Sequence, residues 1–202
     1  DTDLLIVAGP GTGKTRTLTY RIAYLIQEKN VAPQEILAVT FTNKAAEEMR
    51  SRLLQIFDEE IVAAITIKTF HALGAMILRE QSSLIDYPAD YSIYNEADKK
   101  ALLRQVTEGL SSAEINELAD KISHAKNNLL LPENVSEKDD FATIYSHYQQ
   151  TLKRQQAFDF DDLIFQPIVL LQEHPEVTEK YQQRFRWISV DEYQDINFAQ
   201  YR

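Results

Sequence analysis

The first 27 residues contain the feature that most restricts the fold of this chain. Leu4 to Ala8 is a short apolar run that ends at a glycine, and such a run is typical of a buried parallel strand. From Lys14 the apolar residues recur at helical spacing and make one stripe, formed by Leu18, Ile22, Leu25 and Ile26. The segment between them is the glycine-rich loop Ala8-Gly-Pro-Gly-Thr-Gly-Lys-Thr15. A strand, a glycine-rich loop and a helix in this order predict an α/β fold.

The residue types of this loop predict a phosphate site. The loop fits the pattern G-x-x-x-x-G-K-[ST], except that Ala8 occupies the first glycine position. Gly11 and Gly13 allow backbone N–H groups to converge on phosphate oxygens without steric conflict. Lys14 supplies a charge for the β and γ phosphates, and the hydroxyl of Thr15 is a ligand for Mg²⁺. The positive end of the following helix faces the same anion, so we expect a nucleoside triphosphate with Mg²⁺ here.

The α/β pattern continues after the loop. We expect strands at Ile36–Thr40 and around Ile65–Ile67, each followed by a helix, the first near Asn43–Phe57 and the second from the Thr69 cap to about Glu80. Alternating strands and helices indicate a parallel sheet flanked by helices.

A helical block interrupts this alternation. From about Tyr91 to Gln156 the sequence shows helical patterns at 98–107, 113–124 and 140–155 and no convincing strand. A helix at 160–172 and a buried strand at 187–190 follow. We therefore predict an ATP-binding subdomain from residues 1–85 and 158–202, with residues 86–157 as an all-helical insertion. Lys99, Lys100 and Arg104 are interpreted as an ordinary basic surface of this insertion.

Composition excludes several classes of protein. The 202 residues contain no cysteine, which rules out disulfides, cysteine-ligated zinc and cysteine nucleophiles. No apolar run approaches the length of a membrane span, and no signal peptide is visible, so a cytoplasmic protein is expected. The net charge of −10 argues against binding nucleic acid through bulk electrostatics, so a nucleic-acid groove would have to be local.

Two acidic residues complete the predicted nucleotide site. The segment Ile188-Ser-Val-Asp191-Glu192 is an apolar strand end followed by adjacent carboxylates. Asp191 is expected to hold Mg²⁺ through water, and Glu192 to act as general base for the attacking water. Alone this pattern is weak, but beside the phosphate loop it predicts an ATPase.

Five segments of the chain are considered together. In chain order they are residues 8–16, Ala38-Val-Thr-Phe-Thr-Asn-Lys-Ala-Ala46 continuing to Arg50, Thr69-Phe-His71, Asp159-Phe-Asp-Asp-Leu163 and Val190-Asp-Glu-Tyr-Gln-Asp195. They resemble motif I, motif Ia, two shorter motifs and motif II of the N-terminal ATPase region of a UvrD/Rep/PcrA-like superfamily-one DNA helicase. The resemblance implies a P-loop, RecA-like sheet in which the helical block is the insertion called subdomain 1B.

The resemblance also implies residue roles. The residues implied to bind nucleotide are Ala8, Gly9, Gly11, Thr12, Gly13, Lys14, Thr15, Arg16 and Gln194, with Arg16 against the adenine. Gln194 and Asp195 would connect the nucleotide site to the DNA. The residues implied to face single-stranded DNA are Phe41, Asn43 and His71. Two of these have structural alternatives, since Phe41 follows an apolar strand and His71 lies at a helix start.

The resemblance implies that the full-length protein is a motor that moves 3′ to 5′ on single-stranded DNA or at a junction between single-stranded and duplex DNA. The chain is expected to be a fragment without the second RecA-like domain and its arginine fingers, so it would bind Mg²⁺-ATP but hydrolyse it slowly. Three alternatives stay open: a small-molecule phosphotransferase, a non-catalytic nucleotide-binding module, and the motor part of a helicase–nuclease.

Overall fold

The computed structural model describes residues 3–7, 9, 12–135 and 140–202. These residues form two compact units, which are described separately. Unit 1 comprises the chain up to Phe70 together with Pro175–Asp195, and unit 2 comprises His71–His174 with Ile196–Arg202.

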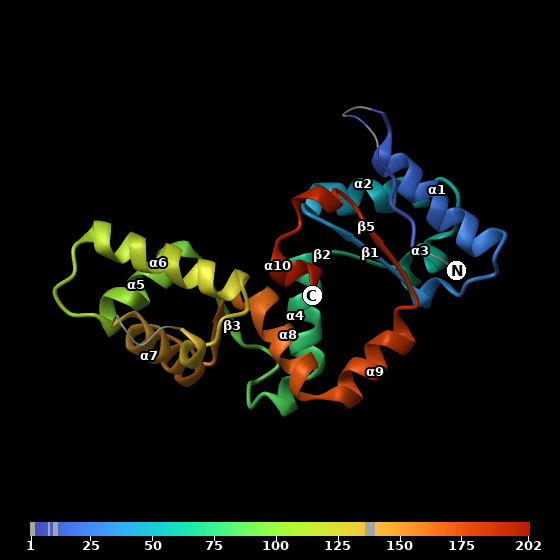
Figure 1. Ribbon diagram of the computed structural model, residues 1–202. Helices are drawn as coiled ribbons and strands as arrows, with labels where there is room; N and C mark the ends of the chain where they lie inside the picture. The colour runs from blue at the N-terminus through green and yellow to red at the C-terminus, as the bar shows by residue number, and fades with distance from the viewer. Residues whose placement is uncertain (1–2, 8, 10–11, 136–139) are drawn as a thin grey trace. The chain divides into compact units, whose positions relative to one another are not determined.

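A three-stranded parallel sheet forms the centre of unit 1 (Figure 1). The middle strand, β1 (Ile36–Thr40), pairs with β2 (Thr66–Thr69) on one side and β5 (Trp187–Val190) on the other. All five residues of β1 are buried, which agrees with its uninterrupted apolar character. The three strands predicted from these segments are confirmed.

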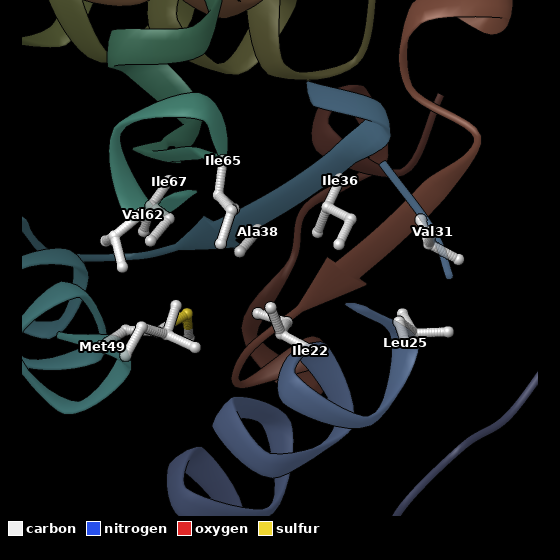
Figure 2. Close-up of a cluster of buried hydrophobic side chains, with 10 residues drawn as sticks. Ile22, Leu25, Val31, Ile36, Ala38, Met49, Val62, Ile65 and Ile67 are labelled. Atoms are coloured by element: carbon white, nitrogen blue, oxygen red, sulfur yellow. The ribbon is translucent and has the colours of Figure 1, made fainter. Parts of the chain in front are cut away.

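Helices on one face of this sheet enclose the core of unit 1. They are α1 (Lys14–Gln27), α2 (Asn43–Leu53) and α3 (Glu59–Ala64), while α9 (Pro175–Arg184) precedes β5. Figure 2 shows Ile36 and Ala38 of β1 facing Ile22 of α1, with Met49 of α2 beside them. The apolar stripe predicted for α1 is therefore its buried face. Short 3₁₀ turns lie at Pro33–Glu35 and Tyr193–Asp195.

The predicted strand at Leu4–Ala8 is wrong for the residues that the structure describes. Residues 4–7 have no strand pairing, and the side chain of Val7 is 87% exposed. Ala8 itself lies outside the described residues. An apolar run becomes a strand only where a neighbouring strand accepts its backbone hydrogen bonds. Residues 3–7 do not pair with β2 or β5, the two edge strands of the sheet in unit 1.

Unit 2 is mainly helical. Its helices are α4 (Phe70–Glu80), α5 (Glu96–Val106), α6 (Ser112–Asn127), α7 (Phe141–Arg154), α8 (Asp162–Glu173) and the short α10 (Phe198–Tyr201). Asn95 and Ser111 begin α5 and α6 with capping boxes, which fix where these helices start. The largest buried side chains between α5, α6 and α7 are Tyr145 and Tyr148.

A second, two-stranded parallel sheet corrects the prediction that residues 91–156 contain no strand. β3 (Ser92–Tyr94) pairs in parallel with β4 (Ala157–Asp159), so that Ile93 lies opposite Phe158. Three residues are too few to show a period of two, which explains why β3 was missed. Phe158 packs with Ala75 and Leu78 of α4 and with Leu163 of α8, so this small sheet joins a core of its own.

The predicted class, an α/β fold with a parallel sheet flanked by helices, is confirmed. Among the described residues, no helix combines the length and apolar character that crossing a membrane requires.

Candidate functional site

The start of α1 combines a left-handed glycine with a first turn that has no acidic residue. Gly13, which precedes the helix, has φ 92°, a left-handed conformation that side chains rarely adopt. The hydroxyl of Thr12 donates a hydrogen bond of 2.6 Å to the carbonyl of Gly9 and closes the described part of the loop. The first turn of α1 contains no acidic residue, so no side chain of the helix itself neutralises its positive end.

The first contact between the loop and the acidic segment joins Thr15 to Asp191. The Thr15 hydroxyl donates to Oδ2 of Asp191 at 3.0 Å, and Asp191 is 4% exposed. The backbone N–H of Asp191 donates to the carbonyl of Val39, so the end of β5 fixes this carboxylate beside β1. In the predicted site the Thr15 hydroxyl would be a ligand of Mg²⁺ and Asp191 would hold the ion through water, and this hydrogen bond keeps the two groups together.

The second contact joins Lys14 to Glu192. Lys14 Nζ lies 3.2 Å from Oε2 of Glu192, and the same oxygen accepts a hydrogen bond of 2.6 Å from Gln194 Nε2. The hydrogen bonds from Gln194 and Lys14 hold the pKa of Glu192 below its usual value, so the carboxylate is ionised at neutral pH. Glu192 has φ 49°, and this strained conformation directs the chain out of β5 at the site.

The structure thus brings five of the predicted site residues together, and they are Lys14, Thr15, Asp191, Glu192 and Gln194. Ala8 and Gly11 lie outside the described residues. The guanidinium of Arg16 is exposed and lies over the ring of Tyr20, 5.4 Å from its centroid, so it is not in this cluster.

Phe41 and Asn43 lie at the end of β1 in unit 1. The Phe41 ring is half-buried and meets Phe70 edge to face, with centroids 5.5 Å apart. Asn43 is exposed in the first turn of α2, whose cap is Thr42. Phe41 is therefore not a fully buried core residue, and part of its ring is accessible.

His71, in unit 2, stacks on an aromatic residue that the sequence interpretation did not single out. The rings of His71 and Phe160 are nearly parallel, with centroids 3.8 Å apart, and Phe160 is 50% exposed. Burial lowers the pKa of His71, although the negative charge of Asp161 opposes this shift, so the ring is neutral at physiological pH. An aromatic residue among three aspartates, in Asp159-Phe-Asp-Asp162, was the available signal for Phe160.

Comparison with protein families shows that the UvrD/REP helicase N-terminal domain matches residues 1–202. The chain belongs to this family. Among its relatives, the ATP-dependent DNA helicase PcrA of Leuconostoc citreum is 43% identical over 208 residues, covering 98% of this chain. PcrA of Staphylococcus epidermidis is 45% identical over the same length.

The chain spans 28% of the length of each of these PcrA relatives. It therefore corresponds to the N-terminal part of a PcrA-type helicase, and the family match includes the loop at residues 8–15 and the acidic pair at the end of β5.

Proposed function

We propose that this chain is the ATP-binding part of a DNA translocase that moves 3′ to 5′ on single-stranded DNA. The observation that carries the proposal is the meeting of α1 and β5, where Thr15 contacts Asp191 and Lys14 contacts Glu192. In functional terms, residues 1–85 and 158–202 would bind ATP, and residues 86–157 would be the helical insertion.

ATP binding requires Lys14 to exchange partners. The side chains of Lys14 and Glu192 are 27% and 38% exposed, so water reaches this ion pair and the lysine can turn from the carboxylate to a phosphate. Backbone N–H groups at the start of α1 would bind the phosphates with Lys14. Arg16 would lie against the adenine, which requires it to leave the ring of Tyr20.

Mg²⁺ would be bound directly by the Thr15 hydroxyl, the phosphates and water, and Asp191 would hold the ion through one of these waters. When bound, the ion neutralises charge on the phosphates.

Glu192 would accept the proton of the attacking water. Its pKa is held low partly by Lys14, so transfer of Lys14 to a phosphate removes one cause of the shift and makes Glu192 a stronger base. Gln194, which donates a hydrogen bond to Glu192, would respond to this change and pass it toward the DNA.

Single-stranded DNA would stack on exposed aromatic rings in each unit. Phe41, with Asn43 beside it, would serve in unit 1, and the His71–Phe160 pair in unit 2. Such stacking tolerates any base, as movement along DNA requires.

Nucleotide binding can be tested with a fluorescent ATP analogue. We expect K14A to raise the Kd of the analogue at least about tenfold, because a charge-assisted hydrogen bond to the phosphates is lost. T15V should abolish the effect of Mg²⁺ on this Kd. K29A is the matched control, because Lys29 is an exposed lysine outside the cluster. Equal Kd values for K14A and K29A would contradict the site.

DNA binding can be tested by anisotropy with a labelled oligothymidine. We expect F160A and F41A each to raise the Kd about 5- to 150-fold, the range for one base–aromatic stack. F198A is the control, because Phe198 is also an exposed phenylalanine, at 53%. A non-catalytic nucleotide module would bind ATP but show no difference among these variants.

A further inference from the structure

Unit 2 contains an ionic cluster that the proposed chemistry does not use. Its aspartates flank Phe160 in the sequence: Phe160 is 50% exposed, whereas Asp159 before it is 0% exposed and Asp162 shortly after it is 1% exposed. These two aspartates close a tight turn, because the backbone N–H of each donates to the carboxylate of the other, at 3.1 and 2.8 Å.

A fully buried lysine of the insertion binds both carboxylates. Lys126 Nζ, on α6, lies 2.7 Å from Oδ2 of Asp159 and 2.8 Å from Oδ1 of Asp162. The hydroxyl of Tyr148, on α7, donates to the same oxygen of Asp159 at 2.8 Å. The turn that bears Phe160 is thus fixed from two helices.

A second buried lysine holds the residue next to Phe160. Lys99 Nζ, on α5, lies 2.7 Å from Oδ2 of Asp161, and both groups also contact the hydroxyl of Ser123 on α6. The prediction that Lys99 is part of a basic surface is therefore wrong, since the residue is 1% exposed.

Stability alone does not explain this arrangement. Removing a lysine from water costs several kcal/mol, and apolar residues of similar volume often stabilise a protein as well or better. The lysines instead fix the orientation of the aspartate side chains. Lys126 binds Asp159 before Phe160 and Lys99 binds Asp161 after it, so the backbone is held on both sides of Phe160.

We propose that Lys99 and Lys126 are positioning residues, through which the helical insertion holds Phe160 stacked on His71 in the orientation that receives a DNA base. This inference rests on the proposed function, in which the pair binds single-stranded DNA. The insertion is then a support for the DNA-binding surface of unit 2.

The test combines a spectroscopic readout with DNA affinity. A ring stacked at 3.8 Å shields the Hε1 proton of His71, and this resonance can be followed by NMR because the chain has only four histidines. F160A defines the unstacked chemical shift. We expect K126M and the charge-neutral pair K99M/D161N to move the shift toward that of F160A and to raise the oligothymidine Kd at least about threefold.

Y148F is the milder variant, in case K126M does not fold, because it removes one hydrogen bond to Asp159 and keeps the ring. It should move the shift in the same direction by a smaller amount. K100M is the matched control, since Lys100 neighbours Lys99 outside the cluster.

The outcomes separate this inference from the proposed function. Folded variants that keep the wild-type shift would overturn the inference, as would a changed shift with unchanged DNA affinity when F160A does weaken binding. If F160A itself leaves the affinity unchanged, the DNA role of the pair is wrong, while a moved shift in K99M/D161N still supports the positioning of Phe160.

Discussion

The two units each contain a lysine bound to carboxylates, and the two clusters differ in their contact with water. In unit 1 the side chains of Lys14 and Glu192 are 27% and 38% exposed. In unit 2 the side chains of Lys126, Asp159 and Asp162 are at most 1% exposed. Exposed ion pairs contribute little to stability and exchange partners readily, whereas breaking a buried pair leaves an uncompensated charge. The exposed pair is therefore suited to the exchange of partners that the proposed function requires, and the buried pairs are suited to holding a fixed geometry.

Replacing the lysine should give the largest difference between the two clusters, measured as the change in the free energy of unfolding. We expect K126M to lower the free energy of unfolding by about 3–5 kcal/mol, because Asp159 and Asp162 stay buried without their cation. K14M should leave it nearly unchanged, because Glu192 is then solvated. Urea denaturation of both variants measures this, and equal losses would remove the distinction between the clusters.

Dependence on pH should give an intermediate difference. Burial and the charge of Asp159 raise the pKa of Asp162 to about 6, although Lys126 opposes this, so from about pH 4 to about pH 6 the folded state holds a proton that the unfolded state has lost. Asp162 therefore lowers stability as the pH rises through this window, on the order of 1–3 kcal/mol. Burial also raises the pKa of Asp159, but the charges of Lys126 and Lys99 outweigh burial and hold this pKa at about 2. The contribution of the Asp159 carboxylate to stability is therefore lost only at lower pH.

The variant D162N isolates this effect. From about pH 4 to about pH 6 the free energy of unfolding of D162N should fall less than that of the wild type. Urea denaturation at each pH measures this. Parallel curves for the two proteins would show that Asp162 titrates normally.

Neutralising the exposed carboxylate of Glu192 should give the smallest effect, measured as a change in affinity for the nucleotide. We expect E192Q to tighten binding of the fluorescent ATP analogue by no more than about fivefold, because Lys14 loses its competing partner. E28Q is the control, since Glu28 is an exposed carboxylate at the C-terminal end of α1. Weaker binding in E192Q would mean that Glu192 helps to hold the nucleotide.

Much of the fold could be predicted because its signals are local. β1 and β5 have the predicted bounds, since each is an apolar run with a clear end, and α1 follows its apolar stripe. The segment 4–7 failed because its apolar character does not reveal whether a partner strand is present. β3 failed because it has three residues and depends on a strand far away in the chain.

The site could be predicted only where residue type determines chemistry. Lys14, Thr15, Asp191 and Glu192 meet as expected, although the loop and the acids are far apart in sequence. The buried Lys99 and Lys126 were not predicted, because lysine is among the residues least often buried and their partners lie on other elements.

The parallel pairing of β3 with β4 has a consequence for engineering the insertion. Because the strands run in the same direction, the end of β3 and the start of β4 lie at opposite ends of the small sheet. Residues 95–156 are therefore the crossover that parallel strands require, and a connection of a dozen or more residues is the minimum for such a crossover. A shortened protein could lose α5 to α7 only if a new segment spanned that distance, so the helices cannot simply be cut out and the ends joined by a tight turn.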